Sequence, residues 1–405
     1  MNDTPKSERP HIAFFGRTNV GKSSLVNALT GQDLALVSDV RGTTTDPVEK
    51  AMEILPFGPV LLIDTPGLDD TTSLGAQRVL RAHRVLGHTD LAILVLERSE
   101  LSAEEAELLK SIRKAEIPYR LVLNKCDEVQ EGEDIPTDPD TPFPVSAKKG
   151  THIARLRELI AKDLVARQGE SDRPLIRDLV PRGSVCILVI PIDSAAPKGR
   201  LILPQQQVLR DLLEGHAQAL CVAPEELSAA LTAHTPALVV CDSQIFSFVA
   251  ETVPEDIPLT SFSILMARYK GTLKNQLEGV AAIRNLTDND CILMAEGCTH
   301  HRQCDDIGTV KIPRWLKAHT GKNLRFETCS GKSFPLDLTD FALVILCGGC
   351  MLNAREMQYR LQLARSQGVP VTNYGLCIAS MKGILARSTA MLKEANIVAQ
   401  REDHA

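Results

Sequence analysis

The sequence predicts an α/β protein built from three α/β domains with mainly parallel sheets. Short apolar runs alternate with helical patterns from about residue 11 to residue 395, and this alternation is typical of parallel sheets with crossover helices. A polar stretch that ends in proline, ARQGESDRP at 166–174, separates the first series of runs from the rest. We therefore expect a linker there.

The composition and net charge of the chain limit the classes of function that it can have. The chain has 405 residues, of which 44% are hydrophobic and 24% are charged, as in a soluble globular protein. Its formal net charge of −6 disfavours a non-specific nucleic-acid binder, which needs a clustered basic surface. No run of about 18 apolar residues occurs and the start is polar, so we expect a cytoplasmic protein without membrane contact. In that reducing compartment the 11 cysteines are not expected to form disulfides.

The first domain is expected at 1–168. Its strands are predicted from short apolar runs that end in polar or turn residues, at 11–16, 60–64, 91–96 and 119–124. A helical pattern at 103–115 lies between the last two runs. The order of these elements predicts a parallel sheet.

The second and third domains are expected at 175–268 and 269–395. Strands in the second are predicted at 184–192, 219–223, 237–242 and 261–267, with helices at 205–216, at 225–234 and after Ser243. Strands in the third are predicted at 290–298, 324–329, 341–350 and 369–375, with helices at 314–321 and 353–368. The second domain contains no compact catalytic motif.

A phosphate-binding loop follows the first predicted strand. Residues 16–23 read GRTNVGKS, the G-x-x-x-x-G-K-S motif, and a helical pattern follows. Its glycines let backbone N–H groups turn around phosphates, and the helix N-terminus adds positive potential. Lys22 is expected to reach the β- and γ-phosphates, and the Ser23 hydroxyl to bind Mg²⁺. The predicted binding residues of this loop are Gly16, Thr18, Asn19, Val20, Gly21, Lys22, Ser23 and Ser24.

Two further elements are expected beside the γ-phosphate. DTPG at 64–67 directly follows a predicted strand, so Asp64 can hold Mg²⁺ through water and the Gly67 N–H can contact the phosphate. RGTTTD at 41–46 is a candidate switch loop, in which a threonine, Thr43 or Thr44, is expected to meet Mg²⁺ when GTP is bound. The predicted catalytic residues are Lys22, Thr44, Asp64 and Gly67.

The remaining two elements predict specificity for guanine. NKCD at 124–127 follows a predicted strand, and Asp127 can accept hydrogen bonds from guanine N1–H and the exocyclic amine. Adenine would leave this carboxylate unpaired, which is a large penalty. SAK at 146–148 completes the base pocket. The predicted base-binding residues are Asn124, Lys125, Asp127, Ser146, Ala147 and Lys148, and the five elements in order identify an N-terminal P-loop GTPase domain, followed by two further α/β domains.

The details of this domain resemble the bacterial TrmE–Era-type GTPases, whose switch reads GTT-x-D. The resemblance implies that Thr44 is the Mg²⁺ ligand and that Asn19, with the loop at 38–41, holds a K⁺ ion beside the phosphates. Leu68 stands where Ras-like enzymes carry a water-orienting glutamine, so hydrolysis must use another group. The alternatives to K⁺ are Arg17 and Arg41.

Cysteines form the second constellation of the chain. Cys298 and His300 end one predicted strand of the third domain, and Cys347 and Cys350, in the motif CGGC, end another. The carboxyl ends of parallel strands share one crevice, where ligands bind. Three thiolates at one point suit an iron–sulfur cluster, or zinc with His300 as the fourth ligand. The third interpretation is that CGGC is a strand–helix turn with packed thiols.

An N-terminal GTPase domain followed by C-x-H-x(46)-C-x-x-C resembles the HydF family, the FeFe-hydrogenase maturation GTPases, over essentially the whole chain. The resemblance implies a 4Fe–4S cluster with one exchangeable iron position, held by Cys298, Cys347 and Cys350, with His300 as a weaker candidate. It also implies that the middle domain dimerises. Other candidates near the cluster are Cys304, Cys377 and the carboxylate of Asp193.

The expected function is therefore that of a GTP-hydrolysing scaffold and carrier. By resemblance, it assembles the di-iron subcluster precursor of FeFe-hydrogenase and transfers it to the apo-hydrogenase. Its implied partners are radical-SAM hydrogenase maturases, the apo FeFe-hydrogenase and a second copy of itself, and no nucleic acid. The alternative is a GTPase regulator of ribosome or tRNA processes with a structural metal site.

Overall fold

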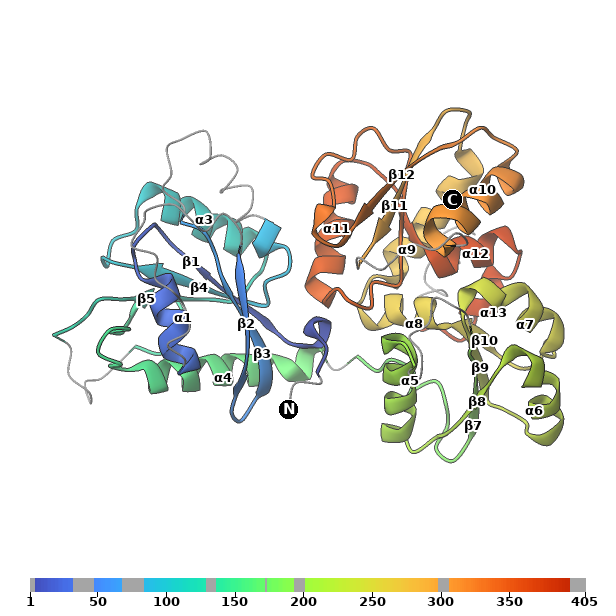
Figure 1. The fold of residues 1–405 in the computed structure, drawn as a ribbon, viewed down its shortest axis with the longest axis horizontal. Coiled ribbons are helices and arrows are strands. Elements are labelled where there is room, and N and C mark those ends of the chain that lie inside the picture. Colours follow the sequence, from blue (N-terminus) through green and yellow to red (C-terminus); the bar gives the residue numbers. More distant parts are fainter. Residues whose placement is uncertain are drawn as a thin grey trace. The chain divides into compact units, whose positions relative to one another are not determined.

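The computed structural model describes residues 4–31, 47–67, 84–128, 136–171, 173–192, 201–297 and 306–393, without the side chains of 167–171 and 332. The chain divides into two compact units, Met1–Asp172 and Arg173–Ala405 (Figure 1). Within the described residues, no helix is long and apolar enough to cross a lipid bilayer.

A six-stranded sheet forms the centre of the first unit, in the order β2-β3-β1-β4-β5-β6. Its strands are β1 (His11–Phe15), β2 (Val48–Ile54), β3 (Gly58–Asp64), β4 (Leu91–Leu96), β5 (Tyr119–Leu123) and β6 (Phe143–Pro144). All pairs are parallel except β2 with β3. The four predicted strands are confirmed, whereas the antiparallel edge strand β2 was not predicted from the sequence.

The described helices of this unit are η1 (Lys6–Glu8), α1 (Lys22–Thr30), α3 (Ala103–Lys114) and α4 (Ile153–Ser171). The Ser102 hydroxyl accepts a hydrogen bond from Glu105 N, and the Glu105 carboxylate accepts one from Ser102 N, so α3 begins with a capping box. The predicted linker at 166–174 is wrong for most of its length. Helix α4 continues to Ser171, because alanine, arginine, glutamine and glutamate in this stretch are good helix formers.

Alternate residues of β1 build a core on each face of this sheet. Ile12 and Phe14 pack in one cluster with residues of α1 and α4, and Ala13 and Phe15 pack in another with residues of α3. Successive side chains of a strand point to opposite faces, so both faces are covered by helices. The phosphate-binding loop begins directly after β1, at the carboxyl end of this strand.

The second unit contains two four-stranded sheets whose strand pairs are all parallel. One has the order β10-β9-β7-β8 and the other β12-β11-β13-β14. Their strands are β7 (Val185–Val189), β8 (Gln218–Val222), β9 (Leu238–Cys241), β10 (Leu259–Ser261), β11 (Cys291–Glu296), β12 (Arg325–Ser330), β13 (Leu343–Leu346) and β14 (Val371–Asn373). The predicted α/β class with mainly parallel sheets is therefore confirmed.

Helices connect these strands. They are α5 (Leu203–Glu214), η2 (Pro224–Glu226), α6 (Leu227–Ala233), η3 (Ser243–Ile245), α7 (Phe246–Thr252), α8 (Phe262–Tyr269), α9 (Leu273–Val280), η4 (Ala281–Asn285), the π-helical η5 (Ile307–Lys311), α10 (Ile312–Thr320), η6 (Gly331–Ser333), α11 (Ala354–Ser366), α12 (Tyr374–Met381) and α13 (Leu385–Thr389).

The prediction of a strand at 261–267 is wrong. The strand there is β10, and the apolar residues that follow it form α8. Ser261 ends the strand and caps the helix, because its hydroxyl accepts a hydrogen bond from Ile264 N at 3.3 Å. Helix α8 is buried along most of its length, and a short apolar run that is buried on all sides does not distinguish a strand from a helix.

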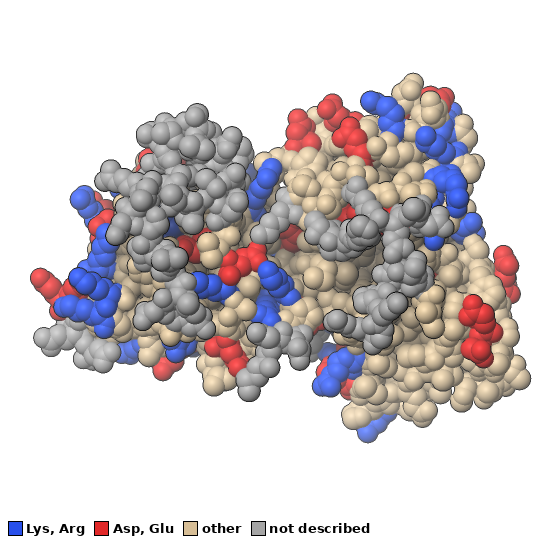
Figure 2. All heavy atoms as spheres, viewed as in Figure 1, with Lys and Arg blue, Asp and Glu red and all other residues tan. Residues whose placement is uncertain are grey.

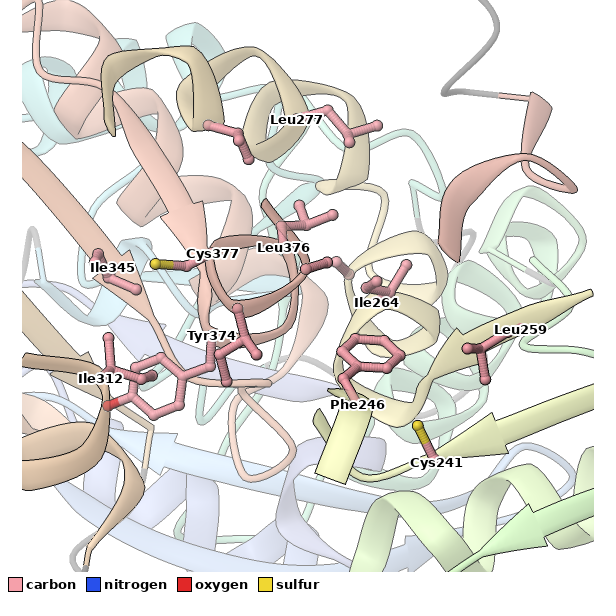
Figure 3. Close-up of a cluster of buried hydrophobic side chains, with 14 of the residues drawn as sticks. Cys241, Phe246, Leu259, Ile264, Leu277, Ile312, Ile345, Tyr374, Leu376 and Cys377 are labelled. Atoms are coloured by element: carbon pink, nitrogen blue, oxygen red, sulfur yellow. The ribbon is translucent and has the colours of Figure 1, made fainter. Parts of the chain in front are cut away.

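One hydrophobic cluster joins the two sheets of the second unit. Phe246, Leu259 and Ile264 come from the elements around the first sheet, and Ile345 and Leu376 from the second (Figure 3). All five are fully buried. The two sheets therefore share a core although they occupy the ranges in which two separate domains were expected.

Charged side chains of both signs lie on the described surface of the first unit. On the face drawn in Figure 2, the lysine and arginine side chains of described residues lie near aspartate and glutamate side chains. This agrees with the slightly acidic composition of the chain.

Candidate functional site

The predicted phosphate loop lies between β1 and α1. Gly16 has a φ of 145°, and a Cβ there would lie 2.3 Å from Val95 O, so only glycine fits. Gly21, which caps α1, has a φ of 92°. Asn19 is exposed and has a φ of 64°, a conformation that asparagine tolerates better than most residues. The loop is thus bent into a shape in which backbone N–H groups can surround an anion.

Lys22 is held at the inside of this loop. Its side chain is buried, and Nζ donates hydrogen bonds to Gly16 O at 3.0 Å and Arg17 O at 2.7 Å. These carbonyls hold the ammonium at the loop that would surround the phosphates. A β- or γ-phosphate can then share the same ammonium without a large movement of the side chain.

Ser23 and Asp64 meet at the carboxyl end of β3. The Ser23 hydroxyl donates to Asp64 Oδ2 at 2.5 Å, while Asp64 Oδ1 is buried without a hydrogen-bond partner among the described residues. Burial raises the pKa of Asp64, although Ser23 and nearby lysines oppose the shift. An unsatisfied buried carboxylate oxygen beside a hydroxyl fits a hard cation such as Mg²⁺.

Gly67 lies against the phosphate loop. A Cβ at Gly67 would lie 2.1 Å from Thr18 Oγ1 and 2.8 Å from Thr18 N, so a side chain cannot be accommodated. Two residues earlier, the Thr65 hydroxyl donates to Phe14 O at 2.6 Å and fixes the path of the chain after β3. The DTPG motif and the phosphate loop therefore touch, as a γ-phosphate sensor requires.

Asn124 connects the phosphate loop to the predicted base pocket. Its Nδ2 donates to Val20 O at 2.9 Å, and its Oδ1 accepts from Ala147 N at 3.1 Å. The side chain is 3% exposed, so both hydrogen bonds are shielded from water. This amide therefore fixes the spacing between the phosphate loop and the segment at 146–148.

Asp127 lies half-buried beside Ser146, whose hydroxyl donates to Asp127 Oδ1 at 2.5 Å. Lys149, which the sequence did not single out, donates from Nζ to Asp127 O at 2.5 Å. Lys149 N also donates to Ser146 Oγ at 3.1 Å, so the two base-pocket segments hold each other in place. Lys148 is exposed.

Lys125 is exposed and forms an ion pair with Glu97, with 2.7 Å between Nζ and Oε1. Glu97 was not predicted as part of the site. The ion pair with Lys125 lowers the pKa of Glu97. Among the other predicted nucleotide residues, Thr43 and Thr44 lie outside the described residues, as do Arg41 and Leu68.

The CGGC loop begins where β13 ends. Cys347 Sγ accepts hydrogen bonds from Gly297 N at 3.0 Å and Gly349 N at 3.3 Å. Gly349 has a φ of 63°, and a Cβ there would lie 2.6 Å from Met357 Sδ. Gly349 thus lets the loop turn so that its backbone N–H, together with that of Gly297, faces a sulfur.

In both cysteines of this loop, the thiolate form is disfavoured relative to the neutral thiol. Burial raises the pKa of Cys347 against the opposing effect of its two N–H donors. Burial also raises the pKa of Cys350, assisted by Cys347 and opposed by the positive charge of Lys270. Two partly buried sulfurs that share one loop suit a soft metal centre, because a bound cation would stabilise both thiolates.

The described residues do not complete a metal site. Within them, no group of three or more histidine, cysteine, aspartate or glutamate side chains could hold a metal ion. Cys298, His300, Cys304 and Asp193 lie outside the described residues. Cys377 is buried in the shared core, where burial raises its pKa to about 12, so it fits a packing role (Figure 3).

Two residues near the CGGC loop were missed from the sequence. Lys270 donates from Nζ to Gly349 O at 2.6 Å although 79 residues separate them. Glu296, at the end of β11, is 3% exposed and accepts a hydrogen bond from the Tyr374 hydroxyl at 3.5 Å. For Glu296, a charged residue at the end of the apolar stretch at 291–295 is a signal that could have indicated it, whereas Lys270 lies among polar residues that give no such signal.

Three family models match the chain. The model of the hydrogen maturase F dimerization domain matches residues 175–271, and that of the hydrogen maturase F tetramerization domain matches 274–391. Together they span more than half of the chain. The model of the 50S ribosome-binding GTPase matches 11–125, so the first unit is a P-loop GTPase domain.

Two similar curated proteins each match only part of the chain. The tRNA modification GTPase MnmE of Synechococcus sp. is 38% identical over 156 residues, which are 37% of this chain and 32% of that protein. MnmE of Aquifex aeolicus is 36% identical over 169 residues, 40% of this chain and 36% of that protein. The chain thus spans about a third of the length of these relatives.

Solved structures of GTPases are also similar to part of the chain. A mutant of Aquifex aeolicus Era bound to GDP and AlF₄⁻ is 18% identical, with a TM-score of 0.32, and the match covers 60% of this chain and 97% of that one. A TM-score this low adds no argument to the one that the family models provide.

Proposed function

The chain belongs to the hydrogen maturase F family, and from that membership we propose that it is a GTP-hydrolysing scaffold and carrier for FeFe-hydrogenase maturation. It holds a 4Fe–4S cluster, assembles the di-iron subcluster precursor and transfers it to apo-hydrogenase. The observation that carries the proposal is the combination of both family models with Cys347 and Cys350 at the end of β13.

The GTPase domain binds GTP and Mg²⁺, and we assign the roles of its residues as follows. Lys22 and the N–H groups of the loop bind the phosphates, and Ser23, Thr44 and Asp64 would hold Mg²⁺. When bound, Mg²⁺ neutralises charge on the β- and γ-phosphates. The Gly67 N–H responds to the γ-phosphate. Asp127, aligned by Ser146, reads the guanine edge.

For hydrolysis, the charge that develops on the transferred phosphoryl group needs a cation besides Lys22. Asn19 is exposed in the phosphate loop, so a cation from solvent can reach it, which supports the K⁺ assignment. K⁺, when bound there, would supply the positive charge of an arginine finger. Arg17 and Arg41 are the alternatives.

In the second unit, Cys347 and Cys350 would hold the cluster together with Cys298. The proposal assigns dimerisation to 175–268 and cluster binding to 269–395. The Gly297 and Gly349 N–H groups facing Cys347 Sγ support a cluster, because hydrogen bonds to sulfur stabilise the thiolate and tune the reduction potential. With three protein thiolates, the fourth iron position remains exchangeable, as a carrier needs.

The dimerization and tetramerization models indicate that the chain self-associates. We propose a homodimer as the basic assembly. The further partners of the proposed function are radical-SAM hydrogenase maturases and apo FeFe-hydrogenase, in the cytoplasm and without membrane or nucleic acid. The mixture of acidic and basic side chains on the face of Figure 2 supports the last point.

Transfer to hydrogenase tests the proposal directly. The protein is produced with the two radical-SAM maturases, isolated anaerobically and added to apo-hydrogenase, and hydrogen evolution is measured. The wild type is expected to activate the hydrogenase, and Cys350→Ser to fail. Cys221→Ser, which changes an exposed cysteine of β8, is the matched control and should act like the wild type. Failure of the loaded wild type would refute the carrier role.

The second candidate is a GTPase regulator of tRNA or ribosome processes with a structural metal site. The names of these relatives favour it, but their similarity covers only 37% and 40% of this chain. A bound zinc without iron in the isolated protein would favour this candidate over the carrier.

A further inference from the structure

Three neighbouring strands of the second sheet, β12, β11 and β13, end at the edge that carries the cysteine site. The last residue of β12 is paired with the last residue of β11, and the last residue of β13 with the second-last residue of β11. Gly331 directly follows β12 and Cys347 directly follows β13, so both lie at this edge, two strands apart. Neighbouring strands are about 4.8 Å apart, so this separation is about 10 Å.

Arg360 of α11 reaches the same edge of the sheet. Its side chain is only 1% exposed, and Nη2 donates to Gly331 O at 2.7 Å. Nε donates to Glu356 Oε1 at 2.9 Å, and the guanidinium carbon lies 4.7 Å from the centre of the Phe334 ring. These contacts hold a positive charge beside the end of β12, where it is shielded from solvent.

One terminal nitrogen of this guanidinium is not used by these contacts. A guanidinium carries N–H donors on each of its nitrogens. Nη1 of Arg360 is buried and has no hydrogen-bond partner in the part of the chain that the structure describes. A buried donor without an acceptor destabilises the folded protein, so native structures seldom contain one that has no use.

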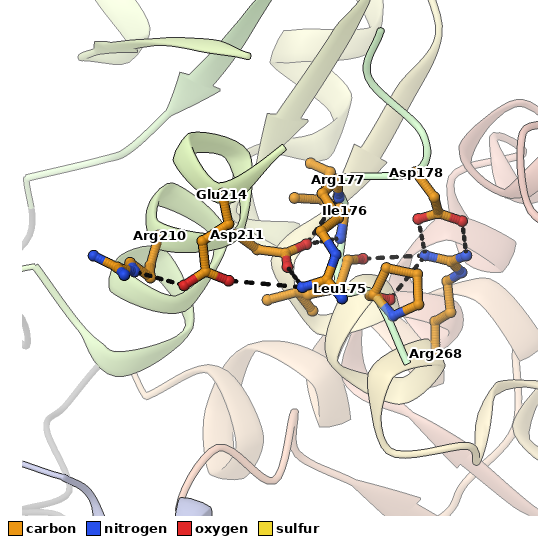
Figure 4. Close-up of polar contacts among 9 residues, drawn as sticks. Leu175, Ile176, Arg177, Asp178, Arg210, Asp211, Glu214 and Arg268 are labelled. Atoms are coloured by element: carbon orange, nitrogen blue, oxygen red, sulfur yellow. Dashed lines mark hydrogen bonds and ion pairs between the residues drawn. The ribbon is translucent and has the colours of Figure 1, made fainter. Parts of the chain in front are cut away.

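Arg268 provides a comparison within the same unit (Figure 4). Its Nη1 donates to Pro174 O at 3.1 Å, to Leu175 O at 3.3 Å and to Asp178 Oδ1 at 2.9 Å. Its Nη2 donates to Asp178 Oδ2. Both terminal nitrogens of Arg268 therefore stabilise the fold, whereas Arg360 uses Nη2 for the fold and leaves Nη1 available for another acceptor.

The charge of Arg360 also acts on the cysteine site. Burial raises the pKa of Cys347, and Arg360 opposes this shift together with the two N–H donors, so the guanidinium is close enough to interact with this sulfur. Without metal, Cys347 is a neutral thiol, and the ion pair with Glu356 offsets the charge of Arg360. A 4Fe–4S cluster held by three thiolates is an anion, and one-electron reduction makes it more negative.

We propose that Arg360 is a cluster-stabilising residue, whose Nη1 donates a hydrogen bond to a sulfur of the cluster held at Cys347 and whose charge raises the reduction potential of that cluster. Glu356 binds the guanidinium edge formed by Nε and Nη2, so it weakens the electrostatic effect and leaves Nη1 free. This inference rests on the proposed function, because it assigns to a residue of α11 a role in holding the proposed cluster.

A redox titration of the full-length protein, reconstituted anaerobically with iron and sulfide, tests this role. The electron paramagnetic resonance signal of the reduced cluster is measured against the solution potential. Arg360→Gln removes the charge and should lower the equilibrium constant for reduction about tenfold, a change that Coulomb's law allows over about 10 Å in a buried site. For one electron, this is a shift of about 59 mV to more negative potential. Arg360→Lys keeps the charge and should retain most of the wild-type potential.

Glu356→Gln should shift the potential in the opposite direction, and it covers the case in which Arg360→Gln does not fold. It removes the negative charge that offsets Arg360, while the amide oxygen can still accept a hydrogen bond from Nε. Loosened packing alone would not move the two variants in opposite directions. Arg365→Gln is the matched control, because Arg365 is an exposed residue of the same helix and solvent screens its charge. It should leave the potential unchanged.

The outcomes separate this inference from the proposed function. A cluster whose potential is the same in the wild type and in Arg360→Gln would overturn the role of Arg360 and leave the carrier role intact. A shift to more negative potential in Glu356→Gln, or an Arg365→Gln shift as large as that of Arg360→Gln, would also overturn it. A wild-type protein that forms no iron–sulfur cluster would refute the proposed function, and this inference with it.

Discussion

The nucleotide site and the cysteine site differ in how they are built. The phosphate loop of the first is one continuous segment, in which Lys22 and its carbonyl partners lie within seven residues of sequence. The second combines the ends of β11 and β13 with Lys270, which is 79 residues away from the glycine it binds. The phosphate loop is therefore a local motif, whereas the cysteine site depends on the tertiary fold.

The two sites also differ in what they contain before a ligand binds. In the nucleotide site, Lys22 and Asn124 already have hydrogen-bond partners in the protein. In the cysteine site, burial raises the pKa of both described thiols, so the neutral thiols are favoured, and a bound cation would favour the thiolates. Substitutions in the preformed nucleotide site should therefore change which base it binds. Substitutions in the cysteine site should instead change whether the site assembles with its ligand.

The largest effect is expected from Asp127→Asn, because the base pocket is preformed. The amide loses the acceptor that guanine requires, and a site built for a specific hydrogen-bond pattern rejects a mismatched base by about 10⁴-fold. We expect weaker GTP binding and a preference for xanthosine triphosphate, measured by nucleotide titration. Ser146, which aligns Asp127, should remain in place, so stability should be nearly unchanged. Equal affinity of the wild type for GTP and ATP would refute the pocket.

Asp64→Asn should separate catalysis from stability. The variant loses a carboxylate that would hold Mg²⁺, so GTP hydrolysis should fall on the order of 10²-fold, the scale of one lost electrostatic contact in a transition state. The free energy of unfolding, by contrast, should rise. The pKa of Asp64 is raised in the folded state, so its ionised form opposes folding above that pKa.

The neutral amide of this variant mimics the protonated carboxyl group. Asp64→Asn should therefore raise the free energy of unfolding of the nucleotide-free, Mg²⁺-free protein at pH 7 to 8. The gain should disappear as the pH falls below the ordinary pKa of aspartate, about 3.9, where the wild type is protonated in both states. Denaturant unfolding at the two pH values measures it. A variant that is less stable than the wild type at neutral pH would contradict this interpretation.

A smaller effect is expected at Asn19. Asn19→Gly removes the carboxamide, and glycine accepts the positive φ, whereas alanine would add strain. Wild-type hydrolysis should rise several-fold when K⁺ replaces Na⁺ at equal ionic strength. The reason is that K⁺ would supply part of the positive charge that an arginine finger supplies. The variant should bind GTP but lose the difference between the ions. Identical wild-type rates in both salts would direct attention to Arg41.

The smallest effect is expected at Glu97. Its ion pair with Lys125 is about half-exposed on both sides, and such pairs contribute little. Glu97→Gln should change the free energy of unfolding by less than about 0.5 kcal/mol. Denaturant unfolding and GTP titration measure the two effects. A tenfold loss of GTP affinity would show that the pair organises the base pocket after all.

The sequence was sufficient for the fold class and for most strands, because each strand is a short apolar run beside a turn. It failed where a helix is buried on all sides, as at 262–269, and where α4 extends into a polar stretch. Strand β2 was missed because it lies at the edge of the sheet and most of its side chains are half-buried or exposed.

Candidate site residues were accessible from the sequence where they belong to a contiguous motif. Gly16, Lys22 and Asp127 are examples, because spacing alone defines their chemistry. Lys149 and Lys270 were missed, since their partners are determined by tertiary packing. The buried position of Lys270 cannot be seen from its neighbours, which read as an ordinary polar end of a helix.

The electron paramagnetic resonance spectrum of the anaerobically reconstituted and reduced protein tests the central claim most directly. The account predicts the signal of a reduced 4Fe–4S cluster in the wild type, with matching iron and sulfide contents. The signal should be lost or strongly altered in Cys298→Ser and Cys350→Ser, and retained in Cys221→Ser. A wild-type protein that contains zinc and shows no iron–sulfur signal would contradict the account.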